Sequence, residues 1–165
     1  MSPAPAAKKA VSAAAEGQQA PDFALPGSGG ETIALSALKG KKVVLYFYPK
    51  DDTPGCTVEA KDFATMADQF KAAGAVVVGM SKDSVQSHDK FKQKYCLPFP
   101  LASDTTGEVC ERYGVWVEKS MYGKSYMGIE RSTFLIDKTG VIRKAWRKVK
   151  VEGHVQEVLE EVKKI

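Results

Sequence analysis

Two unbroken apolar runs, at 43–48 and 75–80, constrain the fold of this chain more than any other feature. Both are rich in β-branched or aromatic residues and lack polar alternation, so they predict strands buried on both faces of a sheet. Apolar side chains between them recur at helical spacing and predict a helix over 57–72. Strand, helix and strand in this order predict a right-handed crossover between parallel strands.

The rest of the chain continues this alternation of strands and helices. The patterns predict short strands around Phe23 and 32–34, a helix capped by Asp83 or Ser84, a strand at 99–102, a short helix at 106–113, a loop over 114–130, a hairpin of 132–136 with 141–146, and a closing helix around 155–162. This order predicts an α/β protein with a thioredoxin-like fold. Its mixed central β-sheet would be flanked by helices on both faces.

The length and composition fit one domain. The chain has 165 residues, 44% hydrophobic and 27% charged. We expect a single domain over 18–165, preceded by a disordered arm over 1–17 that is rich in Ala, Lys, Ser and Gln. The arm lacks the apolar core of a secretory signal, and no stretch approaches the ~20 apolar residues of a membrane span. A cytoplasmic protein without a membrane partner is therefore expected.

Charge and metal-ligand spacing exclude other classes. The net charge of +4 comes without a module of aromatic and basic residues, so nucleic-acid binding is not expected. His88 and His154 have no Cys or carboxylate at metal-ligand spacing and are interpreted as surface helix residues. We therefore expect no metal site.

The chain has three cysteines: Cys56, Cys96 and Cys110. An odd, sparse set argues against a secreted disulfide scaffold. No Cys-x-x-Cys pair occurs, which excludes a zinc ribbon and a thioredoxin dithiol motif.

Cys56 follows the buried strand 43–48 and stands on the first turn of the predicted helix. Unpaired backbone N–H groups and the helix dipole favour a thiolate over a thiol at this place. The sequence therefore predicts redox chemistry centred on Cys56.

Residues around Cys56 suit attack of a thiolate on a peroxide. Negative charge builds on oxygen during the attack, so fixed donors must hold the peroxide. The hydroxyl of Thr53 can meet sulfur or peroxide, and the N–H groups of Gly55 and Cys56 are candidate donors. Pro49 stiffens the loop and shields the site from water. Thr53 and Pro49 are also consistent with a simple turn and helix cap.

A cation is still needed at this site, and Arg131 is the candidate. It stands at the entrance to the predicted strand 132–136, where a sheet can direct it towards Cys56. Its guanidinium stays charged and offers a rigid donor fork, which Glu59 could orient. An isolated arginine is otherwise a solvated surface residue.

The longer motifs are similar to those of a known family. The segment 46–57, YFYPKDDTPGCT, resembles the peroxiredoxins of the bacterioferritin comigratory protein, or peroxiredoxin Q, subfamily. So do the motifs at 114–124 and 128–137, and the resemblance covers residues 18–165. It implies a thioredoxin-like fold, thiol-dependent reduction of hydrogen peroxide and organic hydroperoxides, and no cofactor. It also implies a monomer, recycled by thioredoxin, glutaredoxin or glutathione.

The resemblance assigns roles residue by residue. Cys56 matches the peroxidatic cysteine, and Pro49, Thr53 and Arg131 match its partners. The resolving cysteine departs from the family pattern. Many members carry it where this chain has Lys61, and others on the next helix near Lys92, whereas this chain offers Cys96 one turn further on.

Three fates remain open for the sulfenic acid at Cys56. The first is an internal disulfide with Cys96, which requires local unfolding of both helix ends. The second is resolution by an external thiol in a one-cysteine enzyme. The third uses Cys110, or an intermolecular bridge, although Cys110 is interpreted as a small buried apolar residue.

Two other functions remain as alternatives. One is a thioredoxin-fold holdase or interaction module, which would have no need of Pro49, Thr53, Cys56 and Arg131 together. The other is a general thiol–disulfide reductase, which the absence of a Cys-x-x-Cys pair disfavours.

Overall fold

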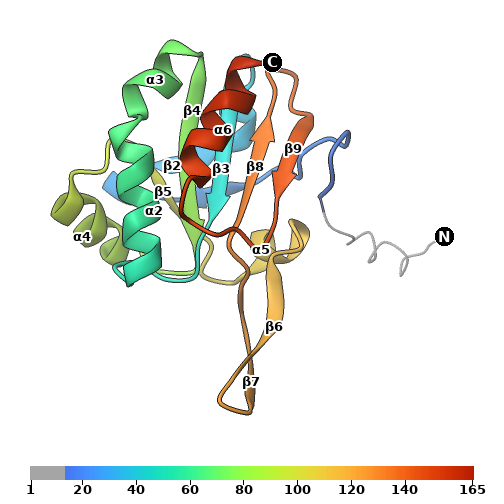
Figure 1. Ribbon diagram of the computed structural model, residues 1–165. Helices are drawn as coiled ribbons and strands as arrows, with labels where there is room; N and C mark the ends of the chain where they lie inside the picture. Colours follow the sequence, from blue (N-terminus) through green and yellow to red (C-terminus); the bar gives the residue numbers. More distant parts are fainter. Residues whose placement is uncertain (1–13) are drawn as a thin grey trace.

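A computed structural model describes residues 14–165 of the chain (Figure 1). Its elements are β1 (Ala24–Pro26), η1 (Ser28–Gly30), β2 (Thr32–Ala34), η2 (Leu35–Leu38), β3 (Lys42–Phe47), α2 (Pro54–Thr65), α3 (Ala67–Ala72), β4 (Ala75–Ser81), α4 (Val85–Tyr95), β5 (Leu101–Ser103), α5 (Glu108–Arg112), β6 (Trp116–Met121), β7 (Lys124–Ile129), β8 (Ser132–Ile136), β9 (Ile142–Trp146) and α6 (His154–Lys163). None of the helices described is long and apolar enough to cross a bilayer.

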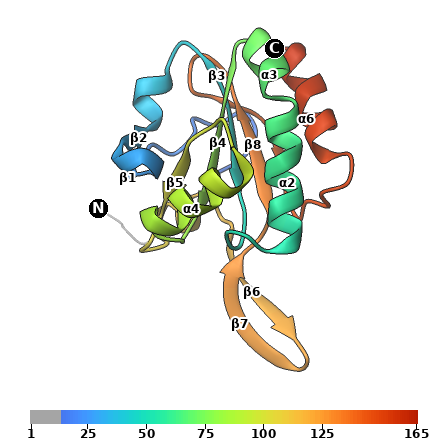
Figure 2. The ribbon, with the colours of Figure 1, turned by 90° about the vertical axis from the view of Figure 1, so that its left-hand side faces the viewer.

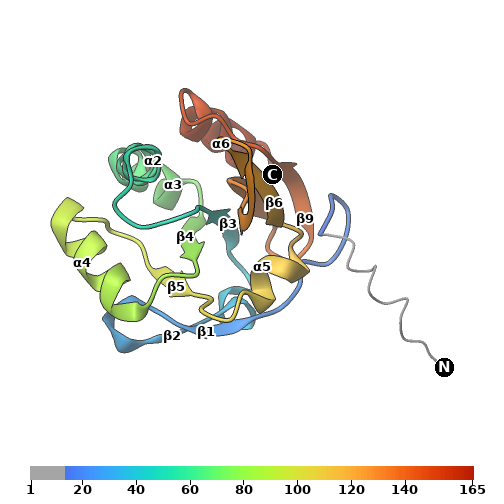
Figure 3. The ribbon, with the colours of Figure 1, turned by 90° about the horizontal axis from the view of Figure 1, so that it is seen from below.

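A five-stranded sheet in the order β5-β4-β3-β8-β9 forms the centre. β3 pairs in parallel with β4, and β4 with β5, whereas β8 is antiparallel to both β3 and β9. The predicted mixed sheet and the predicted crossover between parallel strands are therefore confirmed. Helices α2, α3 and α6 cover one face, and α5 with the β1–β2 segment covers the other (Figures 2 and 3).

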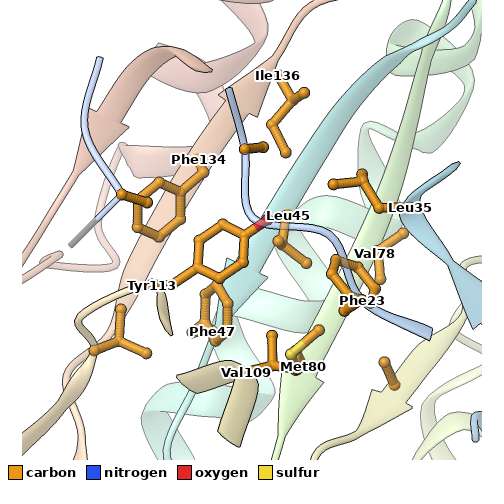
Figure 4. Close-up of a cluster of buried hydrophobic side chains, with 14 of the residues drawn as sticks. Phe23, Leu35, Leu45, Phe47, Val78, Met80, Val109, Tyr113, Phe134 and Ile136 are labelled. Atoms are coloured by element: carbon orange, nitrogen blue, oxygen red, sulfur yellow. The ribbon is translucent and has the colours of Figure 1, made fainter. Parts of the chain in front are cut away.

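Successive side chains of β3 point to opposite faces of the sheet and pack into two hydrophobic clusters. Val43, Leu45 and Phe47 point into one hydrophobic cluster, where Phe47 contacts Tyr113 and Phe134 (Figure 4). The intervening residues point into the second cluster, beneath α2 and α6. Because both faces are buried, the strand reads as a continuous apolar run.

Two secondary-structure predictions differ from the structure. The predicted helix over 57–72 begins earlier, at Pro54, and divides at Met66 into α2 and α3. The predicted loop over 114–130 contains the hairpin of β6 and β7, which extends away from the domain (Figure 1). Tyr122 and Gly123, both with positive φ, form its two-residue turn. Most of the hairpin is exposed, so apolar alternation does not reveal it.

The segment before β1 is packed along the sheet. Residues 1–13, most of the predicted arm, lie outside the described residues. Residues 14–17, which the sequence placed in the arm, contact the domain. Ala14 is buried, and the Glu16 carboxylate accepts a hydrogen bond from the N–H of Ala145 at 3.1 Å. Further on, Gln19 forms a bridge with Val141 beside β9. The described domain therefore begins before residue 18.

Both edges of the sheet are covered by this early part of the chain. Ile142 of β9 accepts a hydrogen bond from Gly17 N–H at 2.8 Å and donates one to the carbonyl of Gln18 at 2.9 Å. At the other edge, Gly27 forms a bridge with Ala102 of β5.

Candidate active site

Cys56 lies at the start of α2, after the loop that follows β3. Thr53 is the N-cap and Pro54 occupies the first helical position, where its missing N–H costs nothing. The first helical bond runs from Thr57 N–H to the Thr53 carbonyl at 2.8 Å. The N–H groups of Gly55 and Cys56 therefore have no acceptor within the helix and can receive an anion. The cysteine side chain is buried, 2% exposed.

Sheet register brings Arg131 to this sulfur. Phe47, the last residue of β3, pairs with Ser132, the first residue of β8. Arg131 directly precedes β8 and therefore lies beside the point where the chain leaves β3. Its Nη2 lies 3.5 Å from Sγ of Cys56, and its Nη1 donates to Oε1 of Glu59 at 2.7 Å. The structure thus brings together the cysteine, the arginine and the glutamate singled out in the sequence.

Glu59 is fully buried one turn along α2. Burial raises its pKa to about 7, although the charge of Arg131 and the hydrogen bond oppose that rise. The charges of Glu59 and Cys56 in turn raise the pKa of Arg131, against the effect of burial. Oε2 of Glu59 has no hydrogen-bond partner among the described residues.

Gly55 leaves room for the guanidinium. A Cβ atom at this position would lie 3.1 Å from Nη2 of Arg131, closer than an ordinary contact. The glycine therefore permits the approach of Arg131 to Cys56.

Pro49 and Thr53 shape the loop before the helix. Pro49 is half-buried, two residues after the end of β3. The Thr53 hydroxyl donates to the carbonyl of Lys50 at 2.8 Å and makes no side-chain bond to the helix N-terminus. Its proton is thus used within the loop, and its oxygen is left to accept. The Thr53 hydroxyl makes no hydrogen bond to Cys56.

The two other cysteines lie in contrasting places. Cys96 is exposed and caps the C-terminus of α4 in the left-handed conformation, with φ of 53°. Cys110 is completely buried on α5, where burial and the neighbouring Asp104 raise the thiol pKa far above its ordinary value. All three cysteines are free.

Both histidines differ from their predicted surface positions. His88 is fully buried, with Nδ1 2.8 Å from Oδ2 of Asp51 and Nε2 2.9 Å from the carbonyl of Ala102. His154 is also buried, with Nε2 2.8 Å from the hydroxyl of Thr133. Burial lowers the pKa of His154 to about 4.

The sequence contained a signal for both histidines, because each shares the apolar face of its helix. His88 lies three residues before Phe91, and His154 four residues before Val158.

A buried polar cluster next to the site went unnoticed in the sequence. Asp51 accepts from the hydroxyl groups of Tyr48 and Ser87, at 2.5 and 2.7 Å, in addition to contacting His88. Asp51, Asp83 and His88 also have ligand-type atoms within 4.8 Å of one another. These atoms already bond to protein groups, so the cluster functions as a structural network rather than as an open metal site.

A buried thiol at the start of a helix, with a guanidinium at its sulfur, places this domain among the thioredoxin-like thiol enzymes. Comparison with known proteins identifies the family. Residues 16–145 match the AhpC/TSA family. A Coxiella burnetii relative that carries the name peroxiredoxin bcp is 62% identical over 87% of this chain and 95% of its own length. Peroxiredoxin Bcp of Bacillus subtilis is 55% identical over 89% of this chain and 94% of its own.

Solved structures agree with these relatives. Peroxiredoxin Q of Xanthomonas campestris superposes with a TM-score of 0.83 at 49% identity, covering 86% of this chain and 90% of that one. The chain belongs to the AhpC/TSA family and, within it, to the peroxiredoxins of the Bcp or peroxiredoxin Q type. It is a thiol-dependent peroxidase, an oxidoreductase that acts on peroxides and is recycled by a thiol reductant. The predicted family, thioredoxin-like fold and peroxidase function are confirmed.

Proposed function

We propose that Cys56 is the peroxidatic cysteine of a single-domain, monomeric enzyme and that Cys96 resolves it. The contact between Arg131 Nη2 and Cys56 Sγ at 3.5 Å carries the assignment of Cys56. A cation at the sulfur can stabilise the negative charge that moves between sulfur and oxygen during the reaction. Supporting roles belong to Pro49, Thr53, Gly55 and Glu59.

In the first step, the Cys56 thiolate attacks one peroxide oxygen. The S–O bond forms as the O–O bond breaks, and the leaving hydroxide or alkoxide takes up a proton. Arg131 and the N–H groups of Gly55 and Cys56 hold the charge that develops on oxygen. Pro49 limits access of water. The product is a sulfenic acid at Cys56 and one molecule of water or alcohol.

In the second step, the Cys96 thiolate attacks the Cys56 sulfur. A disulfide forms as the S–O bond of Cys56 breaks, and the sulfenic oxygen departs as hydroxide, which takes up a proton to give water. Because the thiolate of Cys96 is exposed while Cys56 is buried, the first turn of α2 and the end of α4 must open locally. A dithiol reductant, thioredoxin in our proposal, then reduces the disulfide, with glutaredoxin or glutathione as alternatives.

Organic hydroperoxides are proposed as substrates alongside hydrogen peroxide. A solved structure of the Xanthomonas campestris bacterioferritin comigratory protein concerns its alkyl peroxide reduction activity. In this chain, the β6–β7 hairpin leaves the domain at the end where α2 begins (Figures 1 and 2) and exposes Met121 and Tyr126. These side chains offer apolar surface to an alkyl group. A cytoplasmic location is proposed because the cysteines are few, odd in number and free.

The burial of Cys56 also favours a second candidate, a one-cysteine enzyme resolved by an external thiol. Peptide mapping of fully reduced protein after one equivalent of hydrogen peroxide separates the two. A Cys56–Cys96 cross-link supports our proposal. Oxygen added at Cys56, with Cys96 and Cys110 still free, contradicts it.

Variants complete this test. Cys56→Ser should abolish peroxide consumption, whereas Cys110→Ser should retain it as a matched control. If Cys56→Ser consumed peroxide as fast as the parent, Cys56 would not be the peroxidatic residue.

A further inference from the structure

A surface tie joins the active-site loop to the helix that carries Cys96. Asp52, in the loop before α2, accepts from Lys94 Nζ at 2.9 Å and from the Tyr95 hydroxyl at 2.8 Å. Both donors lie in the last turn of α4, directly before Cys96. These two hydrogen bonds lower the pKa of Asp52, so the tie is charged at neutral pH.

Tyr95 also links this tie to α2. The ammonium of Lys61, on α2, lies 5.7 Å from the centre of the Tyr95 ring, and that ring packs edge-on against Phe91 at 5.5 Å. The end of α4 is therefore held from both segments that border Cys56. The proposed second step requires these segments to separate.

A second, buried anchor holds the same loop more firmly. The N–H of Asp51 donates to Oδ2 of Asp83 at 2.8 Å, and the Asp51 carboxylate contacts His88 on the first half of α4. The contact between Asp51 and His88 is shielded from water, whereas the side chains of Asp52 and Lys94 are 41% and 58% exposed. The loop and the body of α4 can thus stay together while the surface tie opens.

The backbone is left-handed at both ends of the surface tie, but only Cys96 is strained by it. Asp52 has φ of 59°, a conformation that Asp tolerates, whereas Cys96 has φ of 53°, which residues other than Gly, Asn and Asp rarely adopt. Unwinding of the end of α4 releases the strain at Cys96. The hydrogen bonds from Lys94 and Tyr95 to Asp52 hold that end of the helix in place.

We propose that Asp52 is a positioning residue that, through Lys94 and Tyr95, sets the rate at which oxidised Cys56 reaches Cys96. This proposal rests on the assignment of Cys96 as the resolving cysteine. With the tie closed, the folded site stays ready for peroxide. With the tie open, the end of α4 unwinds and Cys96 can attack the sulfenic acid. The tie therefore also determines how long the sulfenic acid is exposed to a second peroxide.

The test removes the two donors and leaves the backbone of Asp52 unchanged. In the double variant Lys94→Met/Tyr95→Phe, the aromatic ring that contacts Phe91 is retained. Rapid quenching after one equivalent of hydrogen peroxide measures peroxide consumption and Cys56–Cys96 disulfide formation separately. Peptide mass spectrometry at rising peroxide measures the sulfinic acid formed per turnover.

We expect disulfide formation to accelerate about five- to tenfold, as the loss of one exposed ion pair and one charged hydrogen bond would give. The sulfinic acid formed per turnover should fall by about the same factor. Peroxide consumption in the first step should stay at the parent rate. A general loss of structure would change both steps, so this split identifies a positioning role.

Two matched variants complete the design. Lys90→Met removes the same charge from an exposed position of α4 and should behave as the parent, because the Lys90 side chain makes no hydrogen bond or ion pair with residues 14–165. Lys94→Arg keeps the charge and should retain the parent rate of disulfide formation.

The outcomes separate the two proposals. If the parent forms the disulfide and the double variant forms it no faster, the role of Asp52 is refuted while the role of Cys96 stands. If the parent forms no Cys56–Cys96 disulfide at all, both proposals are refuted.

Discussion

Replacement of Arg131 by Met tests the chemistry at the sulfur most directly. Methionine retains most of the length of the side chain and removes its charge. The guanidinium lies 3.5 Å from the Cys56 sulfur. At that distance the attraction between unit charges is about 1 kcal/mol in bulk water and about 5 kcal/mol at an effective dielectric constant near 20.

The side chain of Arg131 is only 17% exposed, so the true value lies between these limits. Since about 1.4 kcal/mol corresponds to a tenfold change in rate, Arg131→Met should slow peroxide attack roughly 10- to 1000-fold. The fold should survive, because the pKa of Glu59, about 7 beside Arg131, would rise further without that cation, so the carboxyl left behind can take up a proton.

Stopped-flow measurement of a single turnover with hydrogen peroxide gives this rate. Arg143→Met is the matched control, because Arg143 is half exposed on β9 and pairs with Asp137. The reasoning is refuted if Arg131→Met reacts within about twofold of the parent, or if Arg143→Met slows as much.

Three further predictions concern the site and its surroundings. Gly55→Ala should slow peroxide attack by up to about tenfold, because the added methyl group displaces Arg131. The higher helix propensity of Ala should raise the free energy of unfolding by up to ~1 kcal/mol. Stopped-flow kinetics and urea unfolding measure the two effects, and an unchanged rate would contradict the steric argument. The folded-state pKa of Glu59, about 7, lies above its ordinary 4.5, so the free energy of unfolding of the parent should fall by roughly 3 kcal/mol as the pH rises between those values. Urea unfolding at about pH 5 and about pH 8 measures this fall, which Glu59→Gln should lack. For His154 the sign is reversed: its pKa of about 4 lies below 6.5, so stability should fall by roughly 3 kcal/mol on acidification through that window, and His154→Gln should remove this part of the acid sensitivity.

Sequence patterns predicted the central sheet because β3 and β4 are buried on both faces and admit few polar residues. The β6–β7 hairpin escaped prediction because its exposed faces carry mixed side chains, so its main signal is the turn at Tyr122 and Gly123. Apolar alternation appears in a strand only when one of its faces is buried, and most of β6 and β7 is exposed.

Within the site, Cys56 and Arg131 could be predicted because helix starts and strand entries are local features with chemical consequences. The bonds of Asp51 and Asp52 to α4 could not, since they join segments far apart in the sequence through pairwise geometry. The Thr53 hydroxyl donates to the carbonyl of Lys50 in its own loop and does not cap α2. Both partners lie within a few residues of Thr53, so sequence spacing alone does not decide between them.

The covering of both sheet edges by residues 17–27 has a consequence for biosynthesis. This segment leaves the ribosome before its partners Ala102 and Ile142, which are made much later. Until then it has no edge to cover, and each new edge strand is briefly open to pairing with another chain. In the finished protein, a neighbouring molecule can pair with the sheet at Ala102 or Ile142 only by displacing this segment, so the same residues oppose aggregation through these edge strands.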